Sequence, residues 1–362
     1  ERLLTMESDV AKLKSIKISG YVQAQFEKYE ANVNPKSTFF MRRVRVKTTY
    51  EAYDGVKFVV QPDFVVNAVT LKDAYVVVNE PWLKTFSLWA GQFNRPNYEV
   101  EYSSSQRETP ERSRIIRALY PGERELGLKL EVAPEEIPVK VQLALLNGNF
   151  SGSQNKDIDN FKDFMARVTY SHSMPESGIG IDFGAHAYFG NVRATSVKVA
   201  NSDYSAGSDV KIGDGITRNW FGGELQFYAD FLGGMSIKSE FVTGTNATPA
   251  ADATKSNQKK EFMGYYFYLI KNIGATNQFT LKYDSYDPNT KLSSDDIGTK
   301  TGSSSGDLSY NTLTVAWHNY WDDNVRITFA YEIPMNEKTN KLSSYKEDLK
   351  DNTFTLRLQA KF

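Results

Sequence analysis

The sequence predicts an all-β fold, a transmembrane antiparallel β-barrel of about 16 strands. Three observations lead to this prediction. Segments of about ten residues alternate apolar and polar side chains along the chain, short turns and long polar loops join these segments in alternation, and the chain ends in Phe362 at the apolar register of its last segment. Alternation places the apolar side chains of a strand on one face and the polar side chains on the other.

The first segment illustrates the pattern. Ile16, Ile18, Val22 and Phe26 share one face of the expected strand, and Lys17 lies on the opposite face. The same pattern recurs through the chain, and the expected strands start near Ile16, Phe39, Val56, Val69, Thr85, Glu125, Val139, Asp163, Ile179, Thr217, Met235, Lys259, Asn277, Leu308, Asn324 and Asn352.

The connections between the segments sort by length. Every second connection is a short turn, such as YDG at 53–55 and WDD at 321–323. The connection near Asn67 is also short, whereas most of the others are long, polar and rich in Ser, Asn, Asp and Gly. Short turns on one side and long loops on the other, with an even number of strands, are typical of an outer-membrane barrel.

A closed barrel also accounts for the composition. Lipid cannot hydrogen-bond an open sheet edge, so a β-structure must close on itself to cross a membrane. Its apolar faces then meet lipid and its polar faces line a lumen, which explains a mean hydropathy of −0.48 in a membrane protein. No apolar run approaches a transmembrane helix, no cysteine is present, and the net charge of −1 points to no nucleic-acid partner. We expect any signal peptide to have been removed.

Soluble β-folds also alternate, and two of them are alternatives. A propeller should show an internal repeat of about 40–50 residues, and we find none. A soluble sandwich gives no reason for long and short connections to fall on opposite sides. The membrane barrel is therefore the preferred interpretation.

The predicted organisation has two parts: a helical periplasmic segment at 1–15 and the barrel at 16–362. In the first part, Leu3, Met6, Val10 and Leu13 have the spacing of a coiled-coil seam. A segment this short is marginal as an isolated helix. It is expected either to pair with copies from neighbouring subunits or to form a helical tail packed on itself or into the pore mouth.

The 95–124 loop is expected to fold into the barrel and narrow it. TPER at 109–112 predicts a helix start, with Thr109 as the cap and Pro110 at the first position, and YPG at 120–122 ends the helix. Ile115 and Leu119 lie four residues apart and can pack against a wall. A helix with an apolar stripe is better placed against the barrel interior than in solvent.

This loop is unusual in its charged residues, because RETPERSRIIRALYPGER at 107–124 holds five arginines and no lysine. Arginine offers a permanent charge and a planar fork of donors that match carboxylate or phosphate. Arg43, Arg45 and Lys47 alternate along the second strand and face the lumen from the wall. The predicted anion-binding and constriction residues are Arg42, Arg43, Arg45, Lys47, Arg107, Arg112, Arg114, Arg117 and Arg124.

Further lumen cations are expected from alternation alone, and they are Lys17, Lys129, Lys140, Arg167, Lys238, Lys282, Arg326 and Arg357. Rings of arginine or lysine favour anions in a pore. The loop also carries glutamates, however, and arginines that face carboxylates across a pore can belong to a general diffusion porin. Both interpretations remain open.

Four segments resemble the phosphate-selective porin O and P family: FFMRRVRVK at 39–47, LKDAYVVV at 71–78, WAGQFNRPNYEVEYSSS at 89–105 and PERS at 110–113. The resemblance implies a trimeric sixteen-strand outer-membrane porin whose arginine-lined pore passes phosphate or polyphosphate. It matches Arg42 and Arg43 to the family's paired arginines, and Arg112 to an arginine of its third loop. Strict alternation directs Arg43 alone into the lumen and leaves Arg42 to reach round the rim.

Two positions depart from the family pattern. Phosphate-selective members carry a lysine where this chain has Val100, and an aspartate where it has Lys72, with Asp73 beside it. The resemblance therefore implies the fold and the porin role, with phosphate binding that is weaker or absent.

The predicted function is passive diffusion of small hydrophilic solutes through the bacterial outer membrane, with a preference for anions, phosphate among them. The expected partners are small anionic or hydrophilic solutes, outer-membrane lipid and lipopolysaccharide, and two further copies in a homotrimer. No nucleic acid, cofactor or metal is expected. The alternatives are a non-selective diffusion porin and a specific channel for a sugar, peptide or organic acid, with Tyr98, Tyr102 and Tyr120 as a sliding surface.

An outer-membrane enzyme is the alternative from another class. The chain has three histidines, His172, His186 and His318, but no G-x-S-x-G motif. His186 lies on a polar strand face and is interpreted as a lumen residue. We therefore predict that the protein is not an enzyme.

Overall fold

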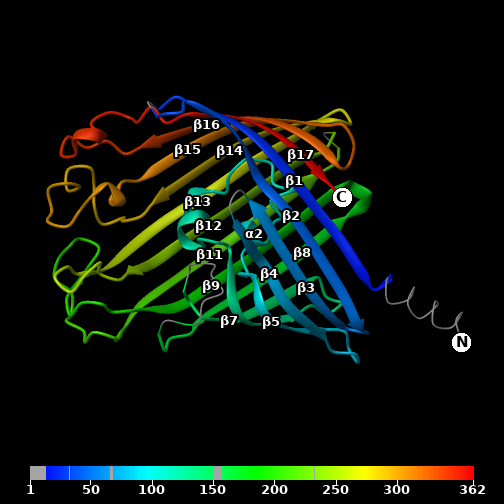
Figure 1. The fold of residues 1–362 in the computed structure, drawn as a ribbon, viewed down its shortest axis with the longest axis horizontal. Helices are drawn as coiled ribbons and strands as arrows, with labels where there is room; N and C mark the ends of the chain where they lie inside the picture. Colours follow the sequence, from blue (N-terminus) through cyan, green and yellow to red (C-terminus); the bar gives the residue numbers. More distant parts are fainter. Residues whose placement is uncertain (1–13, 32, 66–67, 150–156, 158, 232) are drawn as a thin grey trace, which may run out of the picture.

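The protein is a closed antiparallel β-barrel (Figure 1). The computed structural model describes residues 14–31, 33–65, 68–149, 157, 159–231 and 233–362. The predicted helix at 1–15 lies almost wholly outside the described residues. Long loops gather at one end of the barrel, on the left of Figure 1, and short turns gather at the other.

The described residues form seventeen strands in one sheet, and sixteen of them build the wall. Their bounds are β1 Ile16–Tyr29, β2 Ser37–Tyr53, β3 Val56–Val65, β4 Ala68–Asn79, β5 Phe86–Asn94, β6 Arg124–Val132, β7 Val139–Leu146, β8 Asp163–Met174, β9 Ile179–Arg193, β10 Val199–Ala200, β11 Gly215–Ala229, β12 Met235–Thr248, β13 Asn257–Ile273, β14 Asn277–Asp287, β15 Tyr310–Tyr320, β16 Val325–Asn336 and β17 Thr353–Lys361. Three 3₁₀ turns lie at Pro175–Ser177, Ser305–Asp307 and Ser343–Tyr345.

The predicted fold class is confirmed, and every predicted strand start lies within two residues of an observed one. The sequence did not predict β10, which pairs in parallel with the first residues of β13 and lies outside the wall. A two-residue strand in a polar loop leaves no alternation to detect. Asn257 holds this crossing together, because its side-chain amide donates to Ser196 O at 2.7 Å and its carbonyl accepts from Ala250 N at 3.0 Å.

The polarity of the barrel is reversed relative to a soluble protein. On β1, Ile18 is 63% exposed on the outer face, while Gln23 on the inner face is fully buried. The same holds around the wall, where the exposed outer side chains include Phe58, Val60, Leu88, Leu128, Leu145, Phe164, Phe189, Leu225, Phe241, Phe267, Phe329 and Leu358. Trp82 and Trp321 are exposed at the short-turn end, where aromatic rings suit a membrane interface. No helix in the described ranges is both long and apolar enough to cross a membrane.

The barrel closes where the last strand meets the first. β17 pairs with β1 in antiparallel register, from Thr353 opposite Tyr29 to Lys361 opposite Tyr21. Two backbone hydrogen bonds between Gly20 and Phe362 extend this pairing, at 2.9 and 3.0 Å. The Phe362 ring lies against Gly20, so the glycine makes the final contact possible.

We predict that Gly20→Val disrupts closure. A Cβ at this position would lie 2.4 Å from Arg45 O and 2.6 Å from the Phe362 ring, and overpacking of this kind costs about 1–3 kcal/mol. The variant should lose its folded form at a lower temperature in heat-dependent electrophoretic mobility. Gly223→Val is the control, since its Cβ would meet nothing closer than 3.8 Å. Equal melting of both variants would contradict this account of closure.

Candidate functional site

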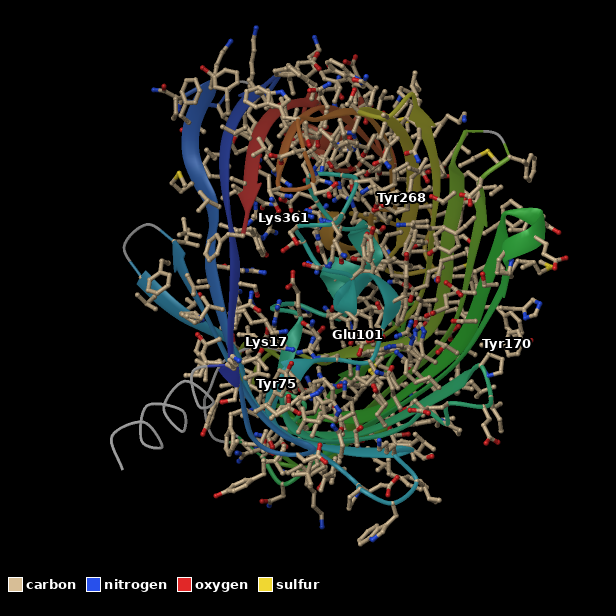
Figure 2. All side chains as sticks on the ribbon, turned by 90° about the vertical axis from the view of Figure 1, so that its right-hand side faces the viewer. Lys17, Tyr75, Glu101, Tyr170, Tyr268 and Lys361 are labelled. Carbon is tan, nitrogen blue, oxygen red and sulfur yellow. The ribbon has the colours of Figure 1, made fainter. Side chains whose placement is uncertain are left out.

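The 95–124 loop leaves the wall after β5 and crosses the inside of the barrel (Figure 2). It carries two short helices, α2 at Tyr98–Glu101 and α3 at Arg114–Leu119, and it returns to the wall at Arg124. Arg95, Asn97 and Ser113 are fully buried. The loop therefore occupies part of the lumen and narrows it.

A carboxylate of the loop holds it in place. Glu99 is 2% exposed and accepts hydrogen bonds from Ser113 N and Ser113 Oγ, at 3.1 and 3.2 Å, and from the Tyr268 hydroxyl on β13 at 2.8 Å. Asn97, next to α2, donates to Glu240 on β12 at 2.5 Å. These contacts join the two helical parts of the loop to each other and to one side of the wall.

Apolar packing secures the same region. Ile115 and Leu119 of α3 are at most 1% exposed and belong to a cluster with Trp220 and Phe262 of the wall. Ile115 approaches β13 at Gly264, where a Cβ would lie 2.5 Å from its terminal methyl group. The predicted apolar stripe of the helix therefore does lie against the wall.

The predicted start of the helix was wrong. α3 begins at Arg114 with Ser113 as its N-cap, four residues after the predicted cap Thr109. The Thr109 hydroxyl instead donates to Glu111 O at 2.9 Å, and the Glu99 carboxylate takes up the Ser113 N–H. Contacts with α2 therefore decide where the helix starts. The predicted end is confirmed, because the helix stops at Leu119 with Tyr120 as its C-cap.

A cavity of about 290 Å³ lies between the loop and the wall of β1–β4. Four of the predicted residues line it: Arg45 and Lys47 from β2, Arg112 from the loop and Arg124 from β6. Alternation on β2 and the return of the loop to β6 bring them together. We call this space the pore cavity.

Three of these cations are tied to carboxylates. Arg45 pairs with Asp63 at 2.7 Å and also donates to Ser104 Oγ of the loop at 3.2 Å. Arg124 pairs with Asp73 at 2.9 Å, and both Arg124 and Arg112 contact Glu123. No carboxylate pairs with Lys47 among the described residues. The lining is therefore positive by a small excess and ordered by its ion pairs.

Nearby arginines lower the pKa of two carboxyls of the loop. Burial alone would raise the pKa of Glu123, but Arg112 and Arg124 hold it well below its usual range. Burial likewise opposes ionisation of Glu111, whereas the charges of Arg42, Arg107 and Arg43 lower the pKa of Glu111 to about 2. Both groups are anions at neutral pH and offset part of the positive charge.

Strict alternation predicted that Arg42 reaches round the rim, but the structure places it elsewhere. A β-bulge follows the Gln23–Arg43 pair, so that Met41 is the next β2 residue opposite β1 and Arg42 is the extra residue. Arg42 turns to the loop and donates to Glu111 Oε1 from Nε and NH2, at 3.0 and 2.7 Å. A second bulge at Lys72 brings Asp73 into register with Gln61, where it meets Arg124.

The other predicted residues lie away from the pore cavity. Arg114 stacks on Tyr310 with its guanidinium carbon 4.0 Å from the ring centroid, and Arg117 is exposed on α3. Arg43 and Arg107 are buried between the loop and the wall, at 3% and 2% exposure. The nine predicted residues therefore divide among several places, and they do not form one ring.

Sequence reasoning missed several residues of the pore cavity. Lys361 lines it from the end of β17, and Tyr21 and the serines of the loop line it with Glu101. The inward register of β1 and β17 pointed to Tyr21 and Lys361. No periodic signal marks Ser103–Ser105, because the path of a loop depends on its anchors.

A closed barrel with an inward loop and a cation-lined cavity beside it is typical of the porin class of outer-membrane channels. Residues 16–362 match the family described as phosphate-selective porin O and P, and the chain belongs to this family. It is an outer-membrane porin, through which small hydrophilic solutes diffuse passively.

Solved structures show the same fold at low sequence identity. OprB of Pseudomonas putida has 8% identity and a TM-score of 0.64, over 99% of this chain and 96% of that one. The channel DcaP of Acinetobacter baumannii has 11% identity and a TM-score of 0.63, over 96% of this chain and 97% of that one. The anion-selective porin of Comamonas acidovorans has 10% identity and a TM-score of 0.58, over 96% of this chain and 99% of that one. No curated protein matches in sequence.

We predict that Glu99→Ala loosens the loop. Each buried donor left without an acceptor costs about 1–3 kcal/mol, and Glu99 serves both Ser113 and Tyr268. Limited trypsin digestion should cut the loop faster, and single-channel current should become noisier. Glu136→Ala removes an exposed turn carboxylate and is the control. A loop that resists trypsin in both variants would refute the anchoring role.

We predict that the Arg42–Glu111 contact weakens in acid. The pKa of Glu111 falls from 4.5 to about 2 on folding, so its stabilising contribution is complete above about pH 4.5 and is lost as the pH falls towards 2. The difference in thermal stability between the native protein and Glu111→Gln should therefore vanish near pH 2. A difference that is constant between pH 6 and 2 would contradict this assignment.

Proposed function

We propose that this porin passes small inorganic and organic anions in preference to cations. The lining of the pore cavity carries this proposal, because Arg45, Lys47, Arg112, Arg124 and Lys361 line it together with only two acidic side chains, those of Asp73 and Glu101. Cations held at a narrow passage lower the energy of an anion and raise that of a cation. The role includes no chemical step on the solute.

The ion pairs limit the strength of this preference. Arg45, Arg112 and Arg124 each contact a carboxylate, which offsets much of their charge for a passing ion. Glu101 is itself offset by Arg167 at 2.9 Å. The uncompensated side-chain charge comes from Lys47 and Lys361, and we infer a moderate preference for anions.

Phosphate specificity receives less support. The position that carries a lysine in phosphate-selective relatives is Val100 here, and its side chain is 1% exposed within the apolar cluster of the loop. This position adds no cation to the pore cavity. We propose that phosphate passes as one small anion among others.

We propose a homotrimer in the outer membrane, in contact with lipid and lipopolysaccharide. A solved structure of Vibrio cholerae OmpT, similar in fold at a TM-score of 0.59, is described as a trimer form. The wall is low at β3–β7, where strands have 8–12 residues, and higher at β11–β13, where they have 14–17. A low wall suits contact with neighbouring copies, and the mass of the protein in detergent tests the assembly.

We predict that Lys47→Gln reduces the anion preference. A unit charge about 8 Å from the ion path contributes roughly 0.5 kcal/mol in water, so the anion-to-cation permeability ratio should fall about two- to fivefold. The measurement is the reversal potential in a KCl gradient across a planar bilayer, at low ionic strength to limit screening. Lys255→Gln, in an exposed outer loop, is the matched control.

The reversal potential of the native protein tests the proposal directly. A reversal potential that shows chloride preference supports it, and a potential near zero makes the protein a non-selective diffusion pore. Phosphate added to one side distinguishes a specific site, because block of the chloride current at low phosphate concentration would contradict the inference drawn from Val100.

A further inference from the structure

Four arginines gather behind the 95–124 loop, away from the lining of the pore cavity. Arg107 belongs to the loop, and Arg43, Arg326 and Arg357 come from β2, β16 and β17. Their exposed fractions are between 2% and 4%. None of the four forms an ion pair with a carboxylate in the described part of the chain.

Hydrogen bonds bring the four side chains into one network. Arg107 NH2 and Arg357 NH2 donate to the same acceptor, Pro110 O, at 3.1 and 3.2 Å. Arg326 NH2 donates to Arg107 O at 3.1 Å. Two guanidinium groups that share a carbonyl oxygen are neighbours, so positive charges are in close contact here.

Arg43 joins the network through two amides. Its NH1 donates to Gln23 Oε1 at 2.9 Å, Gln23 Nε2 donates to Gln359 Oε1 at 2.6 Å, and the same Gln359 oxygen accepts from Arg326 at 3.4 Å. All these partners are neutral. The amides therefore orient the arginines without offsetting their charge.

The surrounding carboxylates are occupied elsewhere. Glu111 is the acid whose charge acts on Arg43, Arg107 and Arg357, and it is hydrogen-bonded to Arg42. Glu108 pairs with Lys238 at 2.7 Å. With Arg42 and Glu111 included, positive charges still outnumber negative ones.

Three buried N–H groups in this cluster have no acceptor: Arg43 Nε, Arg107 NH1 and Arg326 Nε. Buried donors without acceptors are unfavourable, and so are buried like charges. A bound small anion would relieve both, since it accepts hydrogen bonds from several guanidinium groups and neutralises their charge.

We propose that a small inorganic anion, a halide or a tetrahedral oxyanion, binds between the loop and the wall among Arg43, Arg107, Arg326 and Arg357. It is a structural ligand that fixes the loop to β2, β16 and β17. The proposal does not depend on ion preference in the pore, because these side chains are not part of the pore-cavity lining.

Thermal unfolding of the purified, detergent-solubilised protein tests the proposal. Chloride, sulfate and phosphate are compared with gluconate at equal ionic strength, because gluconate is much larger than these three ions. We expect the midpoint to rise by roughly 4 °C with at least one of the three ions, as saturation by a ligand requires. Their rank order identifies the anion.

Arg357→Gln should remove this rise, because it deletes one charge of the cluster. Arg193→Gln removes an exposed arginine at the end of β9, and this variant should still show the rise in the unfolding midpoint. Equal midpoints in all four salts for the native protein would overturn the proposal.

Crystals of the native protein soaked in bromide provide a second test that needs no variant. Anomalous density within hydrogen-bond distance of Arg107 and Arg357 supports the site. If sulfate or phosphate alone raises the midpoint, density for that oxyanion at the same place is expected. Water at this place under every salt condition would refute the proposal. Reversal potentials measured separately report on the pore cavity, so the two proposals can fail independently.

Discussion

The rest of this structure depends on the satisfaction of backbone hydrogen bonds in lipid. An exposed N–H or C=O group costs several kcal/mol in hydrocarbon, so a β-protein can cross a membrane only as a closed sheet. Closure here is a pairing of β1 with β17 that ends in the contact of Phe362 with Gly20. Once the sheet is closed, the outer face must be apolar and the inner face polar, and the lumen becomes available for charged side chains.

The charged lumen in turn explains how a long loop can lie inside it. The 95–124 loop brings buried glutamates and arginines into the barrel, and such groups are tolerated only when they are paired or hydrogen-bonded. On one side, Glu99 meets Ser113 and Tyr268, and Ile115 packs at Gly264. Where the loop meets β2, β16 and β17, arginines outnumber carboxylates. The loop therefore combines a satisfied anchor with a region of excess positive charge, and the pore cavity lies beside it.

Alternation predicted which wall residues face inward, and it did so for the lumen cations as well as for the lipid face. It failed where the two-residue period is interrupted. The bulge at Arg42 adds one residue to β2 and directs two consecutive arginines to the inside. The prediction of the helix start failed for a related reason. The local capping signal at Thr109 was overridden by the carboxylate of Glu99 in α2, which lies fourteen residues before Ser113 in the chain.

The sequence by itself determined the barrel, its strands, the polarity of its faces and the presence of an arginine-rich loop directed to the interior. These properties follow from local period and composition, which each segment expresses independently of its partners. The tertiary structure alone decided which of the arginines share a space. Arg45, Lys47, Arg112 and Arg124 meet at the pore cavity, whereas Arg43 and Arg107 lie behind the loop with Arg326 and Arg357. That division depends on contacts between residues far apart in the chain, and no period within a single segment contains them.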